Sequence, residues 1–499
     1  MTKPMEPLIF EKSLPGAGGL DLPQPGVPAP PVEELLSGVP LRQKLPLLPQ
    51  VSEPQVVRHY TRLSQLNHAV DVGFYPLGSC TMKYNPKVND ELAGLSGFAD
   101  LHPYQDESEV QGVLALVWEL EQVLLALTGL TRVSFQPSAG AQGELVGILM
   151  IRAYHREKEG SDRRNIVLIP DSAHGTNLAT AAMAGYRVVE LPSSERGLID
   201  PDVLRRALSD QVAALMLTNP NTLGLFEEDI LEISALVHDA GGLIYYDGAN
   251  LNAIMGKVRP GDMGMDVVHM NLHKTFSTPH GGGGPGAGPV AVGGLLEPYL
   301  PVPLVGRRPV SGTSDDPRGE FFLDYHRPRS IGRVKGFHGN VGVLIRAYAY
   351  MRRMGGIGLR QSAEDAVLAA NYLRAGLSDA YHIPYDRPCM HEFVASAAKQ
   401  KAHGVRAFDI AKRLLDFGVH APTVYFPLIV PEALMIEPTE SEDKAALDAF
   451  IEALLRIDQE AREDPELVLR APVTTPVRRP DEVNAARRPV LRFEGPVED

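Results

Sequence analysis

The sequence contains few cysteines and no excess of positive charge. Only two cysteines, Cys80 and Cys389, occur among 499 residues, so a framework of several disulfides is excluded and a reducing compartment is expected. The formal net charge is −14, whereas nucleic acids and anionic membranes are bound through basic patches. We therefore expect a cytoplasmic protein whose partners include neither a nucleic acid nor a membrane.

Long hydrophobic runs are also missing. No uninterrupted apolar run approaches the roughly 20 residues that a membrane helix needs, and the longest candidate, Val110 to Leu127, contains Glu119, Glu121 and Gln122. The segment Met1 to Glu6 lacks the apolar core of a signal peptide. The chain is 44 % hydrophobic and 22 % charged, which is typical of soluble globular proteins. Its length is sufficient for a large core and more than one domain.

The two ends of the chain are rich in proline. Proline fixes φ and removes a backbone donor, so the first part of the sequence is expected to form neither a helix nor a central strand. We interpret residues 1–55 as an extended arm that lies on another surface. Residues 471–499, rich in proline and arginine, are expected to form an irregular tail.

The middle of the chain alternates between two hydrophobic periods. Ser108 to Gln111 resembles a capping box that opens a helix, and Gly129 would end that helix. Short apolar runs then alternate with helical stretches, which predicts a mostly parallel sheet covered on both faces. The expected strands are Ile166–Ile169, Val188–Val189, Ala213–Leu217, Leu243–Tyr246 and Val267–Val268, with helices at 202–208, 230–240, 346–354 and 360–377.

Polar residues follow several of these strands. His174 comes after the first, Asn219 and Asn221 after the third, Asp247 after the fourth and Lys274 after the fifth. Ligands of open α/β sheets bind outside the carboxyl ends of the strands. We therefore expect these side chains to converge on one site.

Lys274 is the most informative of them. It lies between a buried-strand pattern and a loop with almost no side chains, Gly281 to Gly286, which suits an imine-forming amine, although a lone lysine is usually a solvated surface cation. Asp247 could merely cap a turn, but a buried carboxylate needs a cationic partner. An aspartate for a pyridinium nitrogen and a lysine for a Schiff base are what pyridoxal 5'-phosphate (PLP) asks of a protein. The pair predicts a PLP enzyme.

The other candidate residues are less specific. Ser138 to Glu144 opens a helical stretch with small residues, so its backbone N–H groups could approach an anion; an ordinary glycine turn is the alternative. His174 could stack on a flat ring, although a lone histidine is usually structural. His391 and Glu392 lack the two-histidine spacing of a zinc site, so no metal is expected. The two cysteines are expected to be buried thiols.

At these positions the sequence resembles the P-protein of the glycine cleavage system, the glycine decarboxylase. The matching segments are Phe74–Lys87, Gln136–Glu144, Asp171–Asn177, Thr218–Glu227 and Asn271–Phe276 with the glycine-rich loop after it. Full-length members of this family are longer single chains that carry the lysine in their C-terminal half. A chain of this size that contains the lysine resembles subunit 2 of the split, two-subunit form.

The resemblance implies a fold and a set of residue roles. The fold would be that of PLP-dependent transferases of fold type I (aminotransferase-like), with a mostly parallel seven-stranded sheet in a large domain, residues 56–339, and a smaller α+β C-terminal domain, residues 340–470. Lys274 would form the Schiff base with PLP, Asp247 would hold the pyridine nitrogen and His174 would stack on the ring. A phosphate loop and polar neighbours of the cofactor or substrate would complete the site: Ser138, Gly140, Ala141, Gln142, Asn219, Asn221 and His273.

The resemblance also implies an activity and partners. Glycine would lose CO2 at the cofactor, and the aminomethyl group would pass to the lipoyl-lysine of H-protein, whose arm would need a channel with the loop 281–288 as one wall. A related subunit 1 would join this chain in a dimer of heterodimers. The N-terminal arm is expected to pack on subunit 1 or on the twin subunit, because its apolar residues are better buried than left in water. These residues are Leu8, Ile9, Phe10, Leu20 and Leu22.

Two alternatives remain open. The first is another fold-type I enzyme, such as an aminotransferase or a cysteine desulfurase, and Arg327, Arg329 and Arg333 could supply the cationic clamp that an aminotransferase needs. The second is a non-catalytic subunit that supports an active partner. The intact Asp247 and Lys274 argue against the second.

Overall fold

The computed structural model describes residues 5–19, 21, 23–44, 46–281, 286–309 and 319–493. The chain divides into two compact units. One consists of Met1–Gly73 with Arg470–Asp499, and the other of Phe74–Leu469. The site lies in the second, larger unit.

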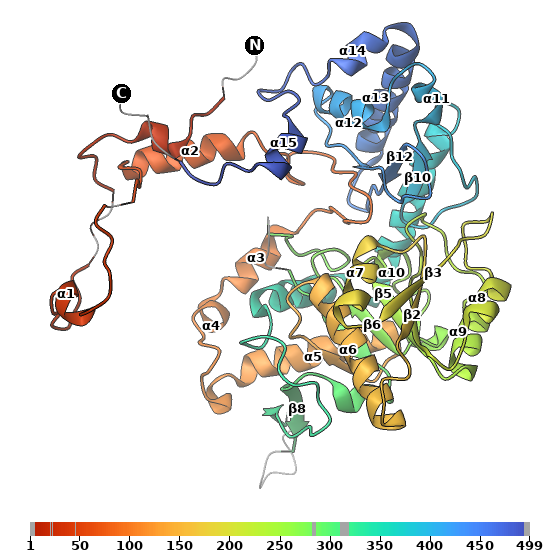
Figure 1. Ribbon diagram of the computed structural model, residues 1–499, viewed down its shortest axis with the longest axis horizontal. Helices are drawn as coiled ribbons and strands as arrows, with labels where there is room; N and C mark the ends of the chain where they lie inside the picture. The colour runs from red at the N-terminus through yellow and green to blue at the C-terminus, as the bar shows by residue number, and fades with distance from the viewer. Residues whose placement is uncertain are drawn as a thin grey trace. The chain divides into compact units, whose positions relative to one another are not determined.

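A seven-stranded sheet organises the larger unit, with the order β1-β7-β6-β5-β4-β2-β3 (Figure 1). Strands β3, β2, β4, β5 and β6 pair in parallel, whereas β7 is antiparallel to both of its neighbours. This confirms the mostly parallel sheet; β7 was not foreseen, because three residues carry too little pattern. The strands are β1 (Arg132–Ser134), β2 (Ile166–Pro170), β3 (Arg187–Leu191), β4 (Val212–Thr218), β5 (Leu243–Gly248), β6 (Val267–Met270) and β7 (Val290–Val292).

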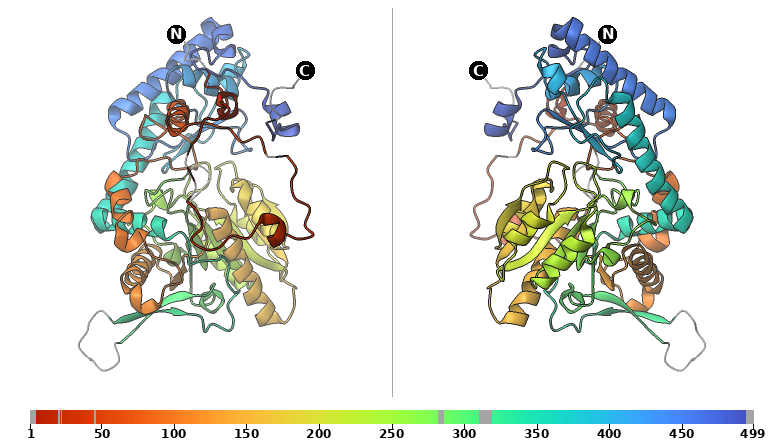
Figure 2. Two further views of the ribbon diagram at one scale, coloured as in Figure 1. Left: turned by 90° about the vertical axis from the view of Figure 1, so that its left-hand side faces the viewer. Right: turned by 90° about the vertical axis from the view of Figure 1, so that its right-hand side faces the viewer.

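Helices cover both faces of this sheet (Figure 2). Because successive side chains of a strand point to opposite faces, β4 contributes Leu215 and Leu217 to one core and Ala214 and Met216 to the other. The first face is covered by α5 (Gln111–Thr128), α8 (Pro201–Ala207), α9 (Ile230–Asp239) and the first part of α10 (Val341–Leu377). The second is covered by α6 (Gly140–Glu159) and α7 (Gly175–Met183).

The start of α5 differs from the expectation. The capping box at Ser108 is wrong, because the Ser108 N–H donates to Asp106 at 2.9 Å inside the 3-10 turn η2 (Glu107–Glu109). The stop is confirmed, since Gly129 is the C-cap with φ 70°. Among the described residues α5 is the one helix long and apolar enough to cross a membrane. Its Leu120 and Leu124 are fully buried in the core of the larger unit, so α5 is a core helix.

A second core lies beyond the break in α10. Gly355 interrupts that helix with φ 60° and ψ 179°, a conformation that is essentially restricted to glycine. After it, β10 (Phe393–Ser396), β12 (Ala433–Ile436) and β11 (Thr423–Val424) form an antiparallel sheet in that order. Helices α12 (Ala407–Asp416) and α13 (Lys444–Glu463) pack on it around a separate hydrophobic cluster. This is the α+β arrangement expected for the C-terminal part; the domain limits at 56, 340 and 471 stay a prediction.

The smaller unit contains more helix than expected. Single helical turns occur in the arm at η1 (Ile9–Lys12) and α1 (Val32–Leu35), and α2 spans Glu53–Ser64. Here proline precedes the turn, where its missing N–H is harmless, so the exclusion of helix was wrong. The tail forms α15 (Glu482–Arg487), which Asp481 caps, and is therefore not entirely irregular. Leu20 and Leu22 lie outside the described residues.

Candidate active site

A cavity of ≈ 220 Å³ lies at the carboxyl ends of β4, β5 and β6. It collects side chains and backbone from distant parts of the sequence. Among the residues that line it are Gly140 and Ala141 of α6, His174, Asp247, His273 and Lys274. The convergence expected from the strand ends is therefore found for these residues.

Asp247 is the buried anion of the cavity. The register of the sheet places it between Thr218 of β4 and His269 of β6. It accepts hydrogen bonds from the Asn177 amide and the Ala249 N–H, each at 3.0 Å, and His269 Nε2 lies 3.3 Å from its Oδ1. Burial alone would raise the pKa of Asp247, but His269 and these hydrogen bonds hold the pKa below its usual value. Asp247 is therefore ionised at neutral pH.

His269 and Tyr245 continue the chain of polar contacts that begins at Asp247. The Tyr245 hydroxyl lies 2.6 Å from His269 Nδ1, and both side chains are buried. Burial lowers the pKa of His269, so the ring is neutral and carries one N–H. The sequence contains a signal that could have found His269. Side chains alternate along a strand, so Tyr245 and Asp247 lie on the same face of the sheet. His269 is paired with Asp247 on the next strand and points to that same face.

Glu144 is a second carboxyl group on the same face. It projects from α6, lines the cavity and accepts a hydrogen bond from the Asn177 amide at 2.9 Å, so Asn177 bridges it to Asp247. Burial, followed by the charge of Asp247, raises the pKa of Glu144 to about 8. The cavity therefore holds one ionised and one protonated carboxyl group at neutral pH. Glu144 belongs to the segment Ser138 to Glu144, but its place in the sequence indicates no role for it.

Lys274 lies on a wall of the cavity. Its Nζ donates to the Ser79 carbonyl at 2.6 Å and lies 3.4 Å from Asn250 Oδ1. Two histidines stand near it: burial lowers the pKa of His273 to about 3 and that of His280 to about 4. Both rings are therefore neutral, and the lysine is the cation of this wall.

The N-terminus of α6 forms another wall. The first N–H groups of this 20-residue helix have no partner within the helix, and Gly140 and Ala141 line the cavity there. A Cβ on Gly140 would lie 2.5 Å from Asn271 Oδ1, so the close approach requires glycine. Ser138 and Gln142 are not among the lining residues; the Ser138 N–H donates to Gln142 Oε1 at 2.8 Å and fixes the turn.

Asn219 and Asn221 are not brought into the cavity. Asn219 Oδ1 accepts from the Glu227 N–H at 3.0 Å, and Asn221 Oδ1 accepts from the Leu223 N–H at the same distance. Both amides therefore shape the loop after β4, and the contact with cofactor or substrate expected for them has no support in this geometry. Their neighbours Thr218 and Thr222 line the cavity instead.

The cavity fits PLP. Asp247 offers an anion for the ring nitrogen, α6 offers N–H groups for the phosphate, and Lys274 offers the amine. Thr218 Oγ1 and Asn271 Oδ1 are buried without a hydrogen-bond partner among the described residues, as expected for groups that meet a ligand. Burial lowers the pKa of His174, and its Nδ1 accepts from the Thr176 N–H at 3.2 Å, so a neutral flat ring stands in the lining.

The arginine clamp of an aminotransferase finds no counterpart here. Arg327 donates to the Glu297 carbonyl at 2.7 Å, and Arg329 pairs with Glu157 at 3.0 Å. Neither these two nor Arg333 is among the described residues that line the cavity. Among the described residues, the cavity lining therefore offers no arginine for a second substrate carboxylate.

Solved structures resemble this fold. A glycine decarboxylase (P-protein) of the glycine cleavage system, in inhibitor-bound form, aligns with a TM-score of 0.68 at 23 % identity, covering 85 % of this chain and 93 % of that one. The cysteine desulfurase CsdA of Escherichia coli aligns with a TM-score of 0.59 at 17 % identity, covering 80 % and 98 %. At these identities the likeness establishes the fold, which is fold type I.

Sequence comparison is more specific. Residues 362–469 match the C-terminal domain of glycine dehydrogenase, and residues 146–283 match aminotransferase class V. A probable glycine dehydrogenase (decarboxylating) subunit 2 from Caldanaerobacter subterraneus subsp. tengcongensis is 57 % identical over 99 % of this chain and 100 % of its own length. The one from Pyrococcus furiosus is 57 % identical over 98 % and 96 %. The chain therefore belongs to the family of glycine dehydrogenase (decarboxylating) subunit 2.

Proposed function

We propose that this chain is the PLP-dependent, glycine-decarboxylating subunit of the glycine cleavage system, with Lys274 as the residue that forms the Schiff base. The observation that carries the proposal is the meeting of Lys274, the ionised Asp247 and the N-terminus of α6 in one cavity. Membership in the subunit 2 family and the aminotransferase class V match support it. No described arginine lines the cavity, which disfavours the aminotransferase alternative.

Bound in this cavity, PLP supplies an electron sink for the pair that remains when the carboxylate of glycine leaves as CO2. Asp247 keeps a proton on the ring nitrogen because it is a buried anion. The Asn177 amide and His269 hold that anion in place through the contacts at 3.0 and 3.3 Å. The protonated Glu144 adds no second charge beside it.

The other walls of the cavity would bind and orient the cofactor. Gly140 and Ala141 would present N–H groups to the phosphate, and the neutral ring of His174 would pack against the cofactor. Ser138 and Gln142 do not line the cavity, but the hydrogen bond between them fixes the turn that starts α6. They would therefore position the N–H groups of α6 and not contact the phosphate themselves. We assign no ligand contact to Asn219 or Asn221.

The partners are part of the proposal. The aminomethyl group passes to the lipoyl-lysine of H-protein, and the family name implies a subunit 1, which we place with this chain in a dimer of heterodimers in the cytoplasm. Cys389 is a buried free thiol, as expected, whereas the free thiol of Cys80 is only partly buried. In the loop 281–288, assigned to the wall of a lipoyl channel, residues 282–285 lie outside the described part of the chain.

The test is release of labelled CO2 from carboxyl-labelled glycine. The chain is assembled with subunit 1 and assayed with and without lipoylated H-protein, and aspartate plus a 2-oxo acid replaces glycine in a parallel assay for transamination. We expect CO2 release from glycine that H-protein stimulates and no transamination. Transamination without CO2 release would overturn the proposal in favour of an aminotransferase.

A further inference from the structure

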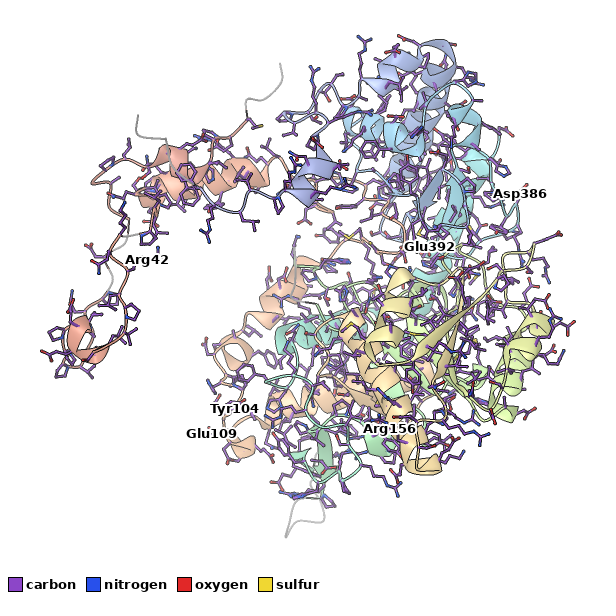
Figure 3. All side chains as sticks on the ribbon, in the orientation of Figure 1. Arg42, Tyr104, Glu109, Arg156, Asp386 and Glu392 are labelled. Carbon is purple, nitrogen blue, oxygen red and sulfur yellow. The ribbon has the colours of Figure 1, made fainter. Side chains whose placement is uncertain are left out.

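Two buried carboxyl groups outside the cavity lining lie close enough to Lys274 for its charge to lower their pKa values. Glu392 precedes β10 and Glu437 follows β12, and both are almost fully buried. Their carboxylate oxygens lie within 4.8 Å of one another, together with a ring nitrogen of His391. Glu392 lies between the C-terminal α+β part and the region of the large sheet (Figure 3). The function proposed above gives these groups no role.

The two carboxylates hold a strained turn. The Ser79 N–H donates to Glu392 at 2.7 Å, and the Thr81 N–H and hydroxyl donate to Glu437 at 3.0 and 2.5 Å. Ser79 and Thr81 adopt φ values of 64° and 47°, which are unfavourable for residues other than glycine. The result of this turn is that the Ser79 carbonyl points at Lys274 Nζ.

The charges around this turn are balanced by the lysine. Burial, followed by the charge of Glu437, raises the pKa of Glu392, and burial raises that of Glu437, while Lys274 opposes both shifts. Repulsion between two carboxylates this close in a buried place favours the state in which one of them is protonated, so that the pair carries one negative charge. Burial lowers the pKa of His391 to about 3, so its ring is neutral. The positive charge of the Lys274 ammonium balances the remaining negative charge, so the pair does not require a metal ion for charge balance.

We propose that the Ser79 carbonyl, Asn250 Oδ1 and the Glu392–Glu437 pair form a dock that holds the ammonium of Lys274 while the lysine is not bonded to the cofactor. This proposal rests on the function proposed above. When substrate replaces Lys274 on the cofactor, the C=N bond to Lys274 would break and a C=N bond to the substrate nitrogen would form. Between two protonated imines, the substrate ammonium gives up two of its three protons and the Lys274 nitrogen gains two, which makes it an ammonium. The released lysine is then a cation, and the dock supplies two neutral acceptors and one negative charge for it.

Two variants can distinguish a dock for Lys274 from a merely structural role of these residues. Asn250→Ala removes one acceptor, and Glu437→Gln keeps the size of the side chain while it removes the charge. Glu432→Gln is the matched control, because Glu432 is also a buried carboxylate of the small sheet region, but it pairs with Lys401 at 2.8 Å and the Ala407 N–H at 3.1 Å. Circular dichroism checks that each variant is folded, and Asn250→Ala decides the matter if Glu437→Gln does not fold.

The first measurement needs no activity. In the assembled protein freed of cofactor, the rate at which an amine-acylating reagent modifies Lys274 at constant pH is followed by peptide mass spectrometry. Loss of a hydrogen bond to a charged group in Asn250→Ala predicts a rate increase of roughly tenfold or more. Loss of the nearby negative charge in Glu437→Gln should change the rate in the same direction. Glu432→Gln should react like the unaltered chain. Equal rates in all four proteins would overturn the dock.

The second measurement uses the enzyme with PLP bound. Glycine is titrated while the absorption band of the cofactor is recorded, which reports how much cofactor has moved from Lys274 to glycine. Without the dock the released lysine is less stable, so both dock variants should need several-fold more glycine for half-conversion. Unchanged titrations in these variants, or the same shift in Glu432→Gln, would contradict the proposal. If the two dock variants were labelled faster than the unaltered protein, but the unaltered protein released no CO2 from glycine, the proposed function would fail while the dock stood.

Discussion

At the scale of single residues, the sequence identified the groups that end strands and missed those that act across them. The position of Lys274, Asp247 and His174 in the cavity lining could be predicted, because each stands at or just beyond a strand that the hydrophobic pattern reveals. Glu144 and Asn177 could not, because their roles depend on how α6 and α7 sit over the sheet. For the same reason the sequence could not show that Asn219 and Asn221 lie outside the described cavity lining, where both amides bond to the backbone of their own loop.

Asp247→Asn should separate cofactor binding from catalysis. The cavity and the N-terminus of α6 remain, so we expect the variant to retain much of its PLP, measured by absorbance after gel filtration. The amide cannot hold a proton on the ring nitrogen, so CO2 release from glycine should fall by at least about tenfold, the effect of roughly 1.4 kcal/mol. Asp262→Asn, at an exposed ion pair with Arg259, is the control. Turnover close to that of the unaltered enzyme would remove Asp247 from this role.

Glu144→Gln should change how stability depends on pH. Burial raises the pKa of Glu144 from 4.5 to about 8 in the folded chain, so between these values the unfolded chain ionises while the folded chain keeps its proton. The stability that this group contributes is therefore complete below pH 4.5 and is lost as pH rises through 8. In thermal unfolding without cofactor, the variant should gain Tm relative to the unaltered chain at pH 8 and gain less at pH 5. A difference independent of pH would show that Glu144 is ionised in the fold.

At the scale of elements, the periodic spacing of hydrophobic residues predicted the strands more reliably than the ends of the helices. The five expected parallel strands are all present, because each is a buried run bounded by a change of period. The start of α5 was misplaced, because Ser108 and Asp106 compete for the same turn and the sequence does not rank them. Strand β7 follows a glycine-rich loop and has three residues, too few for a pattern.

Gly140→Ala tests the start of α6. The new Cβ would lie 2.5 Å from Asn271 Oδ1, which must then move into the cavity or displace the helix. We expect PLP affinity, measured by titration, to fall by about tenfold, the effect of roughly 1.4 kcal/mol. Gly112→Ala, also in the first turn of a helix but with no atom within 4 Å of the new Cβ, is the control and should bind PLP normally. Equal affinity in both variants would show that the approach of α6 to the ligand is not tight.

At the scale of the whole molecule, the fold class followed from alternation of strands and helices, and the details did not. The large sheet and the small α+β core agree with the expectation. The pairing of the two chain ends could not be foreseen: Phe10 stacks on Phe493 at 4.8 Å, a contact between residues at opposite ends of the sequence. No local pattern encodes such a contact.

The arm should matter for assembly. Several of its apolar residues remain exposed in this chain, among them Leu8 at 58 %, Leu14 at 59 % and Leu35 at 62 %. Buried apolar surface contributes roughly 25 cal/mol per Å², so we expect the arm to pack on subunit 1 or on the twin subunit. Deletion of residues 1–40 should lower the mass of the complex with subunit 1 in light scattering. A complex of unchanged mass and activity would show that the arm is dispensable.

The central claim, that Lys274 holds the cofactor, is tested most directly by reductive trapping. The assembled enzyme is treated with borohydride, which fixes the cofactor to its lysine, and the digested peptides are identified by mass spectrometry. Lys83 is an internal comparison, because it is a buried lysine of the same chain that pairs with Glu440 at 2.6 Å. The account predicts that the label lies on the peptide containing Lys274 and that Lys274→Ala, although folded, retains no covalent cofactor and releases no CO2 from glycine. A label on Lys83 or on any other lysine would contradict it.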